Sequence, residues 1–363
     1  MSRRSNRALI AFVTLATVSA CTVQRMQPST AMASMDPNDH LAHMSAADLH
    51  GPMVAEGPID MNMQGHEGLP ASNQTAAARL KASPRHGEWV KIAWEPGSKD
   101  SLMAWVVYPK AGGKAPVVVV VHEIFGLSTW VQGVADQVAA EGFVAIAPDL
   151  ISRVRGGPSS ITLSDDSARK LIGGVDAAER NRGIMAAANY AMMQPSATQK
   201  YGVIGYCWGG QTVFMHAING GVKGFSGGVA FYGLPFMNAG MAATATMAAM
   251  PGGVNTDSLA KIKAPVMLLS GTKDARIGAA MPGLDSAMKK LGKNYVGTNY
   301  EGAIHGFLRA QDDVIPPPTG RNGAPPPPPR ADAELQAEQA ANLAATKDGW
   351  PKTVAFLKKN LKS

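Results

Sequence analysis

Cysteine is scarce in this chain of 363 residues, which contains only Cys21 and Cys207. Cys21 ends an N-terminal segment that reads as an export signal, and exported proteins meet an oxidising compartment. If Cys21 is lipidated or removed on export, Cys207 has no partner within the chain, so an internal disulfide is excluded. Cys207 is then either a buried, inert side chain or a reactive thiol.

Charged residues are also few, at 17% of the chain, and the formal net charge is a modest +7. Lysines and arginines are scattered and form no basic stripe interleaved with aromatic residues, which argues against a nucleic-acid partner. Hydrophobic residues make up 45% of the sequence, which is enough for a sizeable core. One α/β domain with additional segments is therefore the expected organisation.

The apolar run near the N-terminus, Ala8–Val18, is too short to cross a bilayer as a helix. Arginines precede it, and it ends in Val18-Ser19-Ala20-Cys21. Residues 1–21 therefore predict an export signal whose end resembles a bacterial lipobox, in which the cysteine becomes the lipidated first residue. Cleavage at an ordinary small-residue site is the alternative. We expect a periplasmic or cell-envelope protein that is held at the membrane only by a lipid on Cys21.

Two further segments have a biased composition. Residues 22–85 are rich in Met, His and Pro without a sustained period, which predicts a disordered tether. Thioether and imidazole groups suit copper, so a metal site is the alternative, but compact ligand spacing is absent. Residues 315–330 form a polyproline insert, which is either a solvated spacer or a ligand for a partner's groove.

The folded domain is expected from about His86 to residue 363, where apolar strand-like runs alternate with helical patterns. Pro116–Val121 is a β-branched run typical of a strand covered on both faces. Later strands are expected at 142–150, 203–204, 228–233, 265–271 and 294–300, and helices at 129–141, 176–193, 285–291, 334–346 and 350–361. This alternation predicts a doubly wound, mainly parallel sheet with helices on both faces.

The stretch Gly205-Tyr206-Cys207-Trp208-Gly209-Gly210 joins one of these strands to a helix. It has the form of a nucleophile elbow with cysteine in place of serine. A side chain at Gly205 or Gly209 would collide with the crossing strand or helix, and the helix N-terminus would favour a thiolate. The alternative is an ordinary strand-to-helix turn in which Cys207 is a small buried apolar residue.

An acid and a histidine follow the elbow in the order that such a site requires. Asp274 lies just after the strand at 265–271, and His305 lies just after the strand that ends at Tyr300. Open α/β sheets place their sites at these carboxyl ends of strands. His305 would take the thiol proton and pass it to the leaving group, while Asp274 would fix the tautomer of the imidazole.

These motifs, with His122-Glu123-Ile124-Phe125-Gly126, Pro148-Asp149-Leu150 and His305-Gly306-Phe307, resemble the dienelactone hydrolase family of α/β-hydrolases over about residues 88–363. The resemblance implies that Glu123 pairs with the resting thiol and swings away when substrate binds. Capping of the next turn by Glu123 is the alternative. The backbone N–H groups of Ile124 and Trp208 would form the oxyanion hole.

Members of this family that open dienelactones hold the substrate carboxylate with two arginines. Arg309 matches one of them and Arg169 the other. Either side chain could instead belong to a surface salt bridge.

The sequence therefore predicts an exported thiol hydrolase that cleaves a small ester or enol-lactone through a Cys207–Asp274–His305 triad and an acyl-cysteine intermediate. No metal or organic cofactor is expected, and the chain is expected to be a monomer. The alternative function is a catalytically silent binding protein of the same fold. In that case the tethered chain would contact a metal or a partner through its His/Met-rich or polyproline segments.

Overall fold

The computed structural model describes residues 65–95, 97–110, 112–156, 170–238, 253–312 and 331–362. Several segments named above therefore lie outside the described residues, namely the export signal with Cys21, residues 22–64, the polyproline insert and Arg169. In the part of the chain that the structure describes, no helix is both long enough and apolar enough to cross a membrane.

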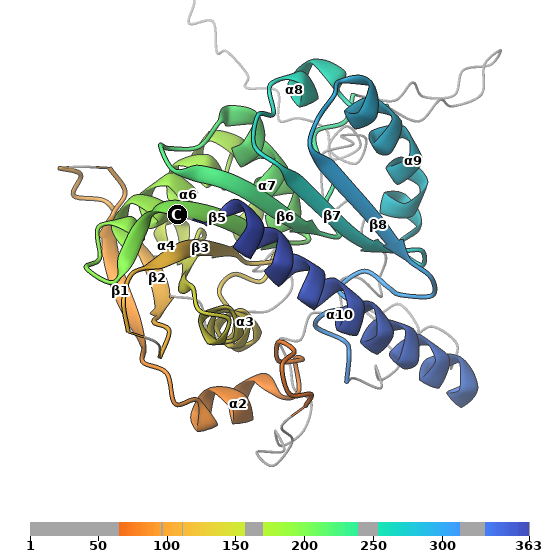
Figure 1. The fold of residues 1–363 in the computed structure, drawn as a ribbon, viewed down its shortest axis with the longest axis horizontal. Helices are drawn as coiled ribbons and strands as arrows, with labels where there is room; N and C mark the ends of the chain where they lie inside the picture. The colour runs from red at the N-terminus through yellow and green to blue at the C-terminus, as the bar shows by residue number, and fades with distance from the viewer. Residues whose placement is uncertain are drawn as a thin grey trace, which may run out of the picture.

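Eight strands form one sheet in the order β1-β2-β4-β3-β5-β6-β7-β8 (Figure 1). Strand β2 pairs antiparallel with both of its neighbours, β1 and β4, and all other pairs are parallel. The strands are β1 (Gly87–Ala93), β2 (Ser101–Val107), β3 (Ala115–Val121), β4 (Val144–Asp149), β5 (Ala197–Tyr206), β6 (Phe225–Phe231), β7 (Val266–Gly271) and β8 (Tyr295–Tyr300). The predicted fold class, a doubly wound and mainly parallel α/β sheet, is confirmed.

Helices cover both faces of this sheet. They are α2 (Ala76–Ala82), α3 (Thr129–Ala140), α4 (Ser152–Arg155), α6 (Ala177–Met192), α7 (Trp208–Asn219), α8 (Thr256–Ala260), α9 (Ala275–Lys290) and α10 (Asp332–Asn360). Helices α3 and α10 lie on one face, and α6 and α7 lie on the other (Figure 1). Glycines in β5 and β6 let the helices approach, because a Cβ at Gly202 would lie 2.8 Å from Leu357 of α10 and one at Gly228 would lie 2.5 Å from Val213 of α7.

Two expected helix boundaries were wrong. The helix expected at 285–291 is the end of the longer α9, which begins directly after Asp274. The two helices expected at 334–346 and 350–361 are the single helix α10, which continues through Pro351. The side chain of Trp350, which belongs to α10, is buried. Its packing keeps the Gly-Trp-Pro stretch helical, although glycine and proline locally favour a break in the helix.

The folded part of the chain also begins earlier than the expected His86. Residues 65–85, here called the N-terminal segment, pack on α3 through α2. The indole N–H of Trp130 donates to the carbonyl of Ala71 at 2.9 Å, and the guanidinium of Arg85 binds Asp136 at 2.5 Å. This segment is built largely from alanine and polar residues, so its sequence lacks the apolar period that would indicate a packed element.

Candidate active site

Cys207 occupies the turn between β5 and α7 with a φ of 56°, a left-handed conformation that is strained for any residue other than glycine. Hydrogen bonds on both sides hold it there. Its N–H donates to the carbonyl of Phe231 at 3.0 Å, and its carbonyl accepts from the N–H of Gln211 at 3.1 Å. The strand, sharp turn and helix expected of a nucleophile elbow are therefore present.

The glycines around Cys207 allow this close approach. A Cβ at Gly205 would lie 2.1 Å from the carbonyl oxygen of Gly209, and one at Gly209 would lie 2.4 Å from that of Val121. Both contacts are shorter than van der Waals packing permits, so the predicted collisions are confirmed. They also show that the start of α7 is pressed against the end of β3, which carries Glu123 and Ile124 into the same region.

His305 and Asp274 meet at the neighbouring strand ends. The Nδ1 of His305 lies 2.6 Å from Oδ2 of Asp274, and both side chains are buried. The other carboxylate oxygen of Asp274 accepts the N–H of Ile277 at 3.2 Å, so the same residue caps α9. A backbone N–H in the loop before the histidine, that of Ile304, donates to Asn342 of α10 at 3.1 Å. Helices α9 and α10 thus fix the acid and the imidazole relative to each other.

The charge on the imidazole depends on its two neighbours. Burial alone would lower the pKa of His305, but negative charge at Cys207 and at Asp274 outweighs burial and raises this pKa well above its usual range. The thiol is itself buried at the N-terminus of α7, where the helix dipole favours negative charge. The structure thus brings together the three residues that the sequence singled out.

Glu123 is paired with Arg309, a partner that the sequence did not indicate. Its Oε2 lies 3.1 Å from the Nε of Arg309, and both side chains are buried. Its other oxygen, Oε1, has no hydrogen-bond partner. A guanidinium is a strong partner for a buried carboxylate. Arg309 is therefore not a surface residue.

The two expected oxyanion-hole donors are tied together by His122, a residue that was noted only as part of a family motif. The N–H of Leu150 donates to its Nε2 at 3.0 Å, so Nδ1 carries the proton and donates to the carbonyl of Glu123 at 2.6 Å. Because the peptide group is planar, fixing this carbonyl also fixes the N–H of Ile124. The imidazole of His122 stacks on the ring of Trp208, with ring centroids 5.5 Å apart.

No sequence motif surrounds Arg180 of α6, so the sequence alone does not indicate it as a site residue. Its guanidinium lies 4.6 Å from the centroid of the Trp208 ring and donates to the side-chain oxygen of Gln211 at 3.1 Å. Burial lowers the pKa of Arg180 to about 10, so it remains charged at neutral pH. Trp208, the residue after the cysteine, is thereby held by two side chains from different elements.

The N-terminal segment reaches the loop that carries His305 and Arg309. The N–H of Asn73 donates to the carbonyl of Arg309 at 2.9 Å, and the side chain of Gln311 donates to the carbonyl of Pro70 at 2.8 Å. These contacts lie outside the region in which the sequence predicted a folded domain. The segment therefore supports the site as well as α3.

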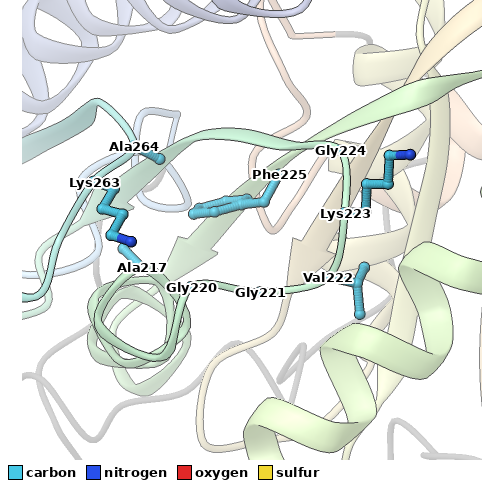
Figure 2. A pocket seen from close by; sticks show the side chains of 9 residues that line it. All are labelled: Ala217, Gly220, Gly221, Val222, Lys223, Gly224, Phe225, Lys263 and Ala264. Atoms are coloured by element: carbon cyan, nitrogen blue, oxygen red, sulfur yellow. The ribbon is translucent and has the colours of Figure 1, made fainter.

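A cavity of about 430 Å³ lies elsewhere, at the end of α7 and the start of β6 (Figure 2). It is lined by glycines, Phe225 and the exposed lysines 223 and 263, among others. Because β6 starts here, the cavity is at the opposite edge of the sheet from the carboxyl ends that carry the site. Within the described ranges, no group of three or more His, Cys, Asp or Glu side chains is placed to hold a metal ion.

Comparison with known proteins gives a consistent family. The model of the dienelactone hydrolase family matches residues 102–361. A Synechocystis protein whose name, carboxymethylenebutenolidase, was assigned by inference is 32% identical over 58% of this chain and 83% of its own length. A similarly named Methylorubrum extorquens protein is 31% identical over 66% of this chain and 77% of its own.

A solved structure shows the same fold. A Klebsiella pneumoniae protein described by inference as a dienelactone hydrolase superposes with a TM-score of 0.56 at 23% identity. The match covers 76% of this chain and 99% of the other.

Proposed function

The chain belongs to the dienelactone hydrolase family and is a hydrolase, and from that premise we propose that it cleaves a small ester or enol-lactone through an acyl-cysteine intermediate. The observation that carries this proposal is the buried contact between His305 and Asp274 beside the strained Cys207. That arrangement supplies a nucleophile, a proton carrier and a group that orients the carrier.

The reaction follows from the positions of these groups. The sulfur of Cys207 attacks the carbonyl carbon, and the negative charge that develops on the oxygen is stabilised by the N–H groups of Ile124 and Trp208. The imidazolium of His305 protonates the leaving oxygen as the C–O bond breaks, which leaves a thioester. Water then attacks the thioester and gives its proton to His305. The C–S bond breaks, the acid is released, and the thiolate–imidazolium pair is restored.

A direct test uses the full chain, a chromogenic short-chain ester and a thiol-alkylating reagent. We expect hydrolysis of the ester and its loss in step with alkylation of Cys207. The alternative of a silent binding protein would be favoured by two results together: no ester hydrolysis, and alkylation of Cys207 that a slow substrate does not prevent.

We also propose that Arg309 recognises a carboxylate on the substrate. It already binds the carboxylate of Glu123 in a desolvated position, and a substrate carboxylate would compete for the same guanidinium. For the second contact with the substrate carboxylate we propose Arg169, on the basis of the family resemblance. The substrates expected on this basis are lactones that bear a carboxylate.

Replacing Arg309 with alanine should lower kcat/KM for carboxylate-bearing lactones by about ten- to a hundredfold, because a charge-assisted hydrogen bond to the substrate is lost. The kcat/KM for neutral esters should fall much less. Parallel assays of a charged and a neutral substrate measure the effect as a ratio. Arg85→Ala is a matched control, because it also breaks a partly buried arginine–carboxylate pair, with Asp136, but on the N-terminal segment. If both variants lower the two activities equally, Arg309 serves the fold and the carboxylate preference is wrong.

For the N-terminus, we propose export followed by attachment of lipid to Cys21, as the lipobox resemblance suggests. Expression of the full chain in a bacterium and mass spectrometry of the mature protein should find a lipidated Cys21 as the first residue. The variant Cys21→Ser should lack the lipid. An unmodified N-terminus after residue 21 would contradict the anchor and leave the hydrolase assignment unchanged.

A further inference from the structure

Tyr232 shares an unusual backbone feature with Cys207. These are the two non-glycine residues of the described ranges with positive φ, at 40° and 56° respectively. They lie at the carboxyl ends of the adjacent strands β6 and β5. Left-handed backbone is rare for a bulky residue, and such strain gathers at functional sites.

Contacts on both sides hold the backbone of Tyr232 in this conformation. Its N–H donates to the carbonyl of Leu269 in β7 at 2.7 Å. The next residue, Gly233, is packed so tightly against the elbow that a Cβ would lie 2.4 Å from the nitrogen of Gln211 and 2.6 Å from the carbonyl oxygen of Cys207. The turn that follows β6 is thus locked against the turn that carries the nucleophile.

This strained turn delivers the tyrosine ring to the catalytic histidine. The ring is completely buried, and its centroid is 4.9 Å from that of His305. Phe307 packs on it from another side, with centroids 5.6 Å apart. The ring is therefore fixed, and so is the direction in which its hydroxyl points.

The hydroxyl of Tyr232 is buried and has no hydrogen-bond partner. Burying a hydroxyl without a partner is costly, so proteins rarely leave one in this state unless it has a use. Other buried polar atoms of the same region also lack a hydrogen-bond partner, among them the hydroxyl of Tyr206 and the Oε1 of Glu123. Three polar groups without partners beside a nucleophile indicate a polar subsite that a ligand completes.

The charges around this hydroxyl indicate what it can bind. Burial raises the pKa of Tyr232 well above its usual range, and the negative charge of Glu123 raises it further, while Arg309 opposes this. The hydroxyl therefore stays protonated and can donate a hydrogen bond. The carboxylate of a substrate offers only acceptor oxygens, so a fixed neutral donor beside Arg309 suits it.

We propose that Tyr232 is a substrate-contacting residue whose hydroxyl donates a hydrogen bond to the carboxylate of a carboxylate-bearing lactone, at the end of the substrate that faces Glu123 and Arg309. The inference rests on the proposed hydrolase function. It assigns to Tyr232 a role in substrate selection, separate from the proton transfers of His305.

The variant Tyr232→Phe tests this directly, because it removes the hydroxyl and keeps the ring against His305. In the full chain we expect kcat/KM for a carboxylate-bearing lactone to fall by about tenfold or more, mostly through KM, and that for a neutral ester of similar size by less than about threefold. The melting temperature should be unchanged or higher, because a buried hydroxyl without a partner is removed.

Tyr295→Phe is the matched control, since it removes another buried hydroxyl, on β8 and away from the elbow, and should leave both activities unchanged. Unchanged kinetics in Tyr232→Phe would overturn the inference, as would equal losses on both substrates, which would mean that the tyrosine serves only His305. Failure of the hydrolase proposal is a different result, since the wild-type chain would then be inactive and Cys207 would not be acylated.

Discussion

Replacing Cys207 with alanine should lower ester turnover by at least about a thousandfold while the protein stays folded. The change removes one sulfur atom from a buried site, which costs little packing, whereas no other described thiol can form the acyl intermediate. Steady-state assays with a chromogenic ester measure the loss, and thermal unfolding followed by circular dichroism checks the fold.

The variant Cys207→Ser separates the chemistry from the size of the side chain. It should also be poor, because a hydroxyl ionises far less readily than a thiol and the proposed mechanism needs an ionised nucleophile. Cys21→Ser is the matched control, since it removes the other cysteine of the sequence and should leave turnover unchanged. Near wild-type activity in Cys207→Ala would end the acyl-cysteine mechanism.

Replacing Asp274 with asparagine should lower kcat by about 10³- to 10⁴-fold. In the native site the carboxylate accepts from Nδ1 of His305, which leaves Nε2 for the thiol. The amide of an asparagine can donate to Nδ1 instead and so favour the wrong tautomer. Asparagine caps helices as well as aspartate does, so α9 should be kept and the fold should be intact.

The same variant should shift the pH dependence in a defined direction. Burial lowers the pKa of His305, whereas the negative charges at Cys207 and Asp274 raise it and prevail. Removing the charge at Asp274 must therefore lower this pKa, so the imidazolium that protonates the leaving group is lost at a lower pH. The alkaline limb of the kcat/KM profile should move to lower pH. An unmoved limb with nearly normal kcat would show that Asp274 only caps α9.

The chemistry-bearing residues could be predicted from the sequence because their signals are local. The β-branched run before Cys207 and the glycines around it define the elbow, and Asp274 and His305 each follow a recognisable strand. Parallel strands bring their carboxyl ends to one edge of the sheet, so residues far apart in sequence could be placed together. Their contact in the structure follows from that topology.

What the sequence could not predict depends on contacts between distant segments. The pairing of Glu123 with Arg309 is decided by which buried partner is in reach, and no local pattern carries this. The alanine-rich composition of the N-terminal segment shows no period and so predicts part of a tether, yet its packing partners lie on α3. The strain at Tyr232 likewise arises from the packing of Gly233 against the elbow.

The central claim, that Cys207 forms an acyl-enzyme, is tested most directly by trapping the intermediate. A Cys21→Ser chain leaves Cys207 as its one cysteine. It is mixed with a slowly hydrolysed ester, quenched in acid, digested and analysed by mass spectrometry. The mechanism predicts the acyl mass on the peptide that contains Cys207, removable by neutral hydroxylamine as a thioester is. Turnover with no acyl group on that peptide, or with one on a serine that resists neutral hydroxylamine, would contradict it.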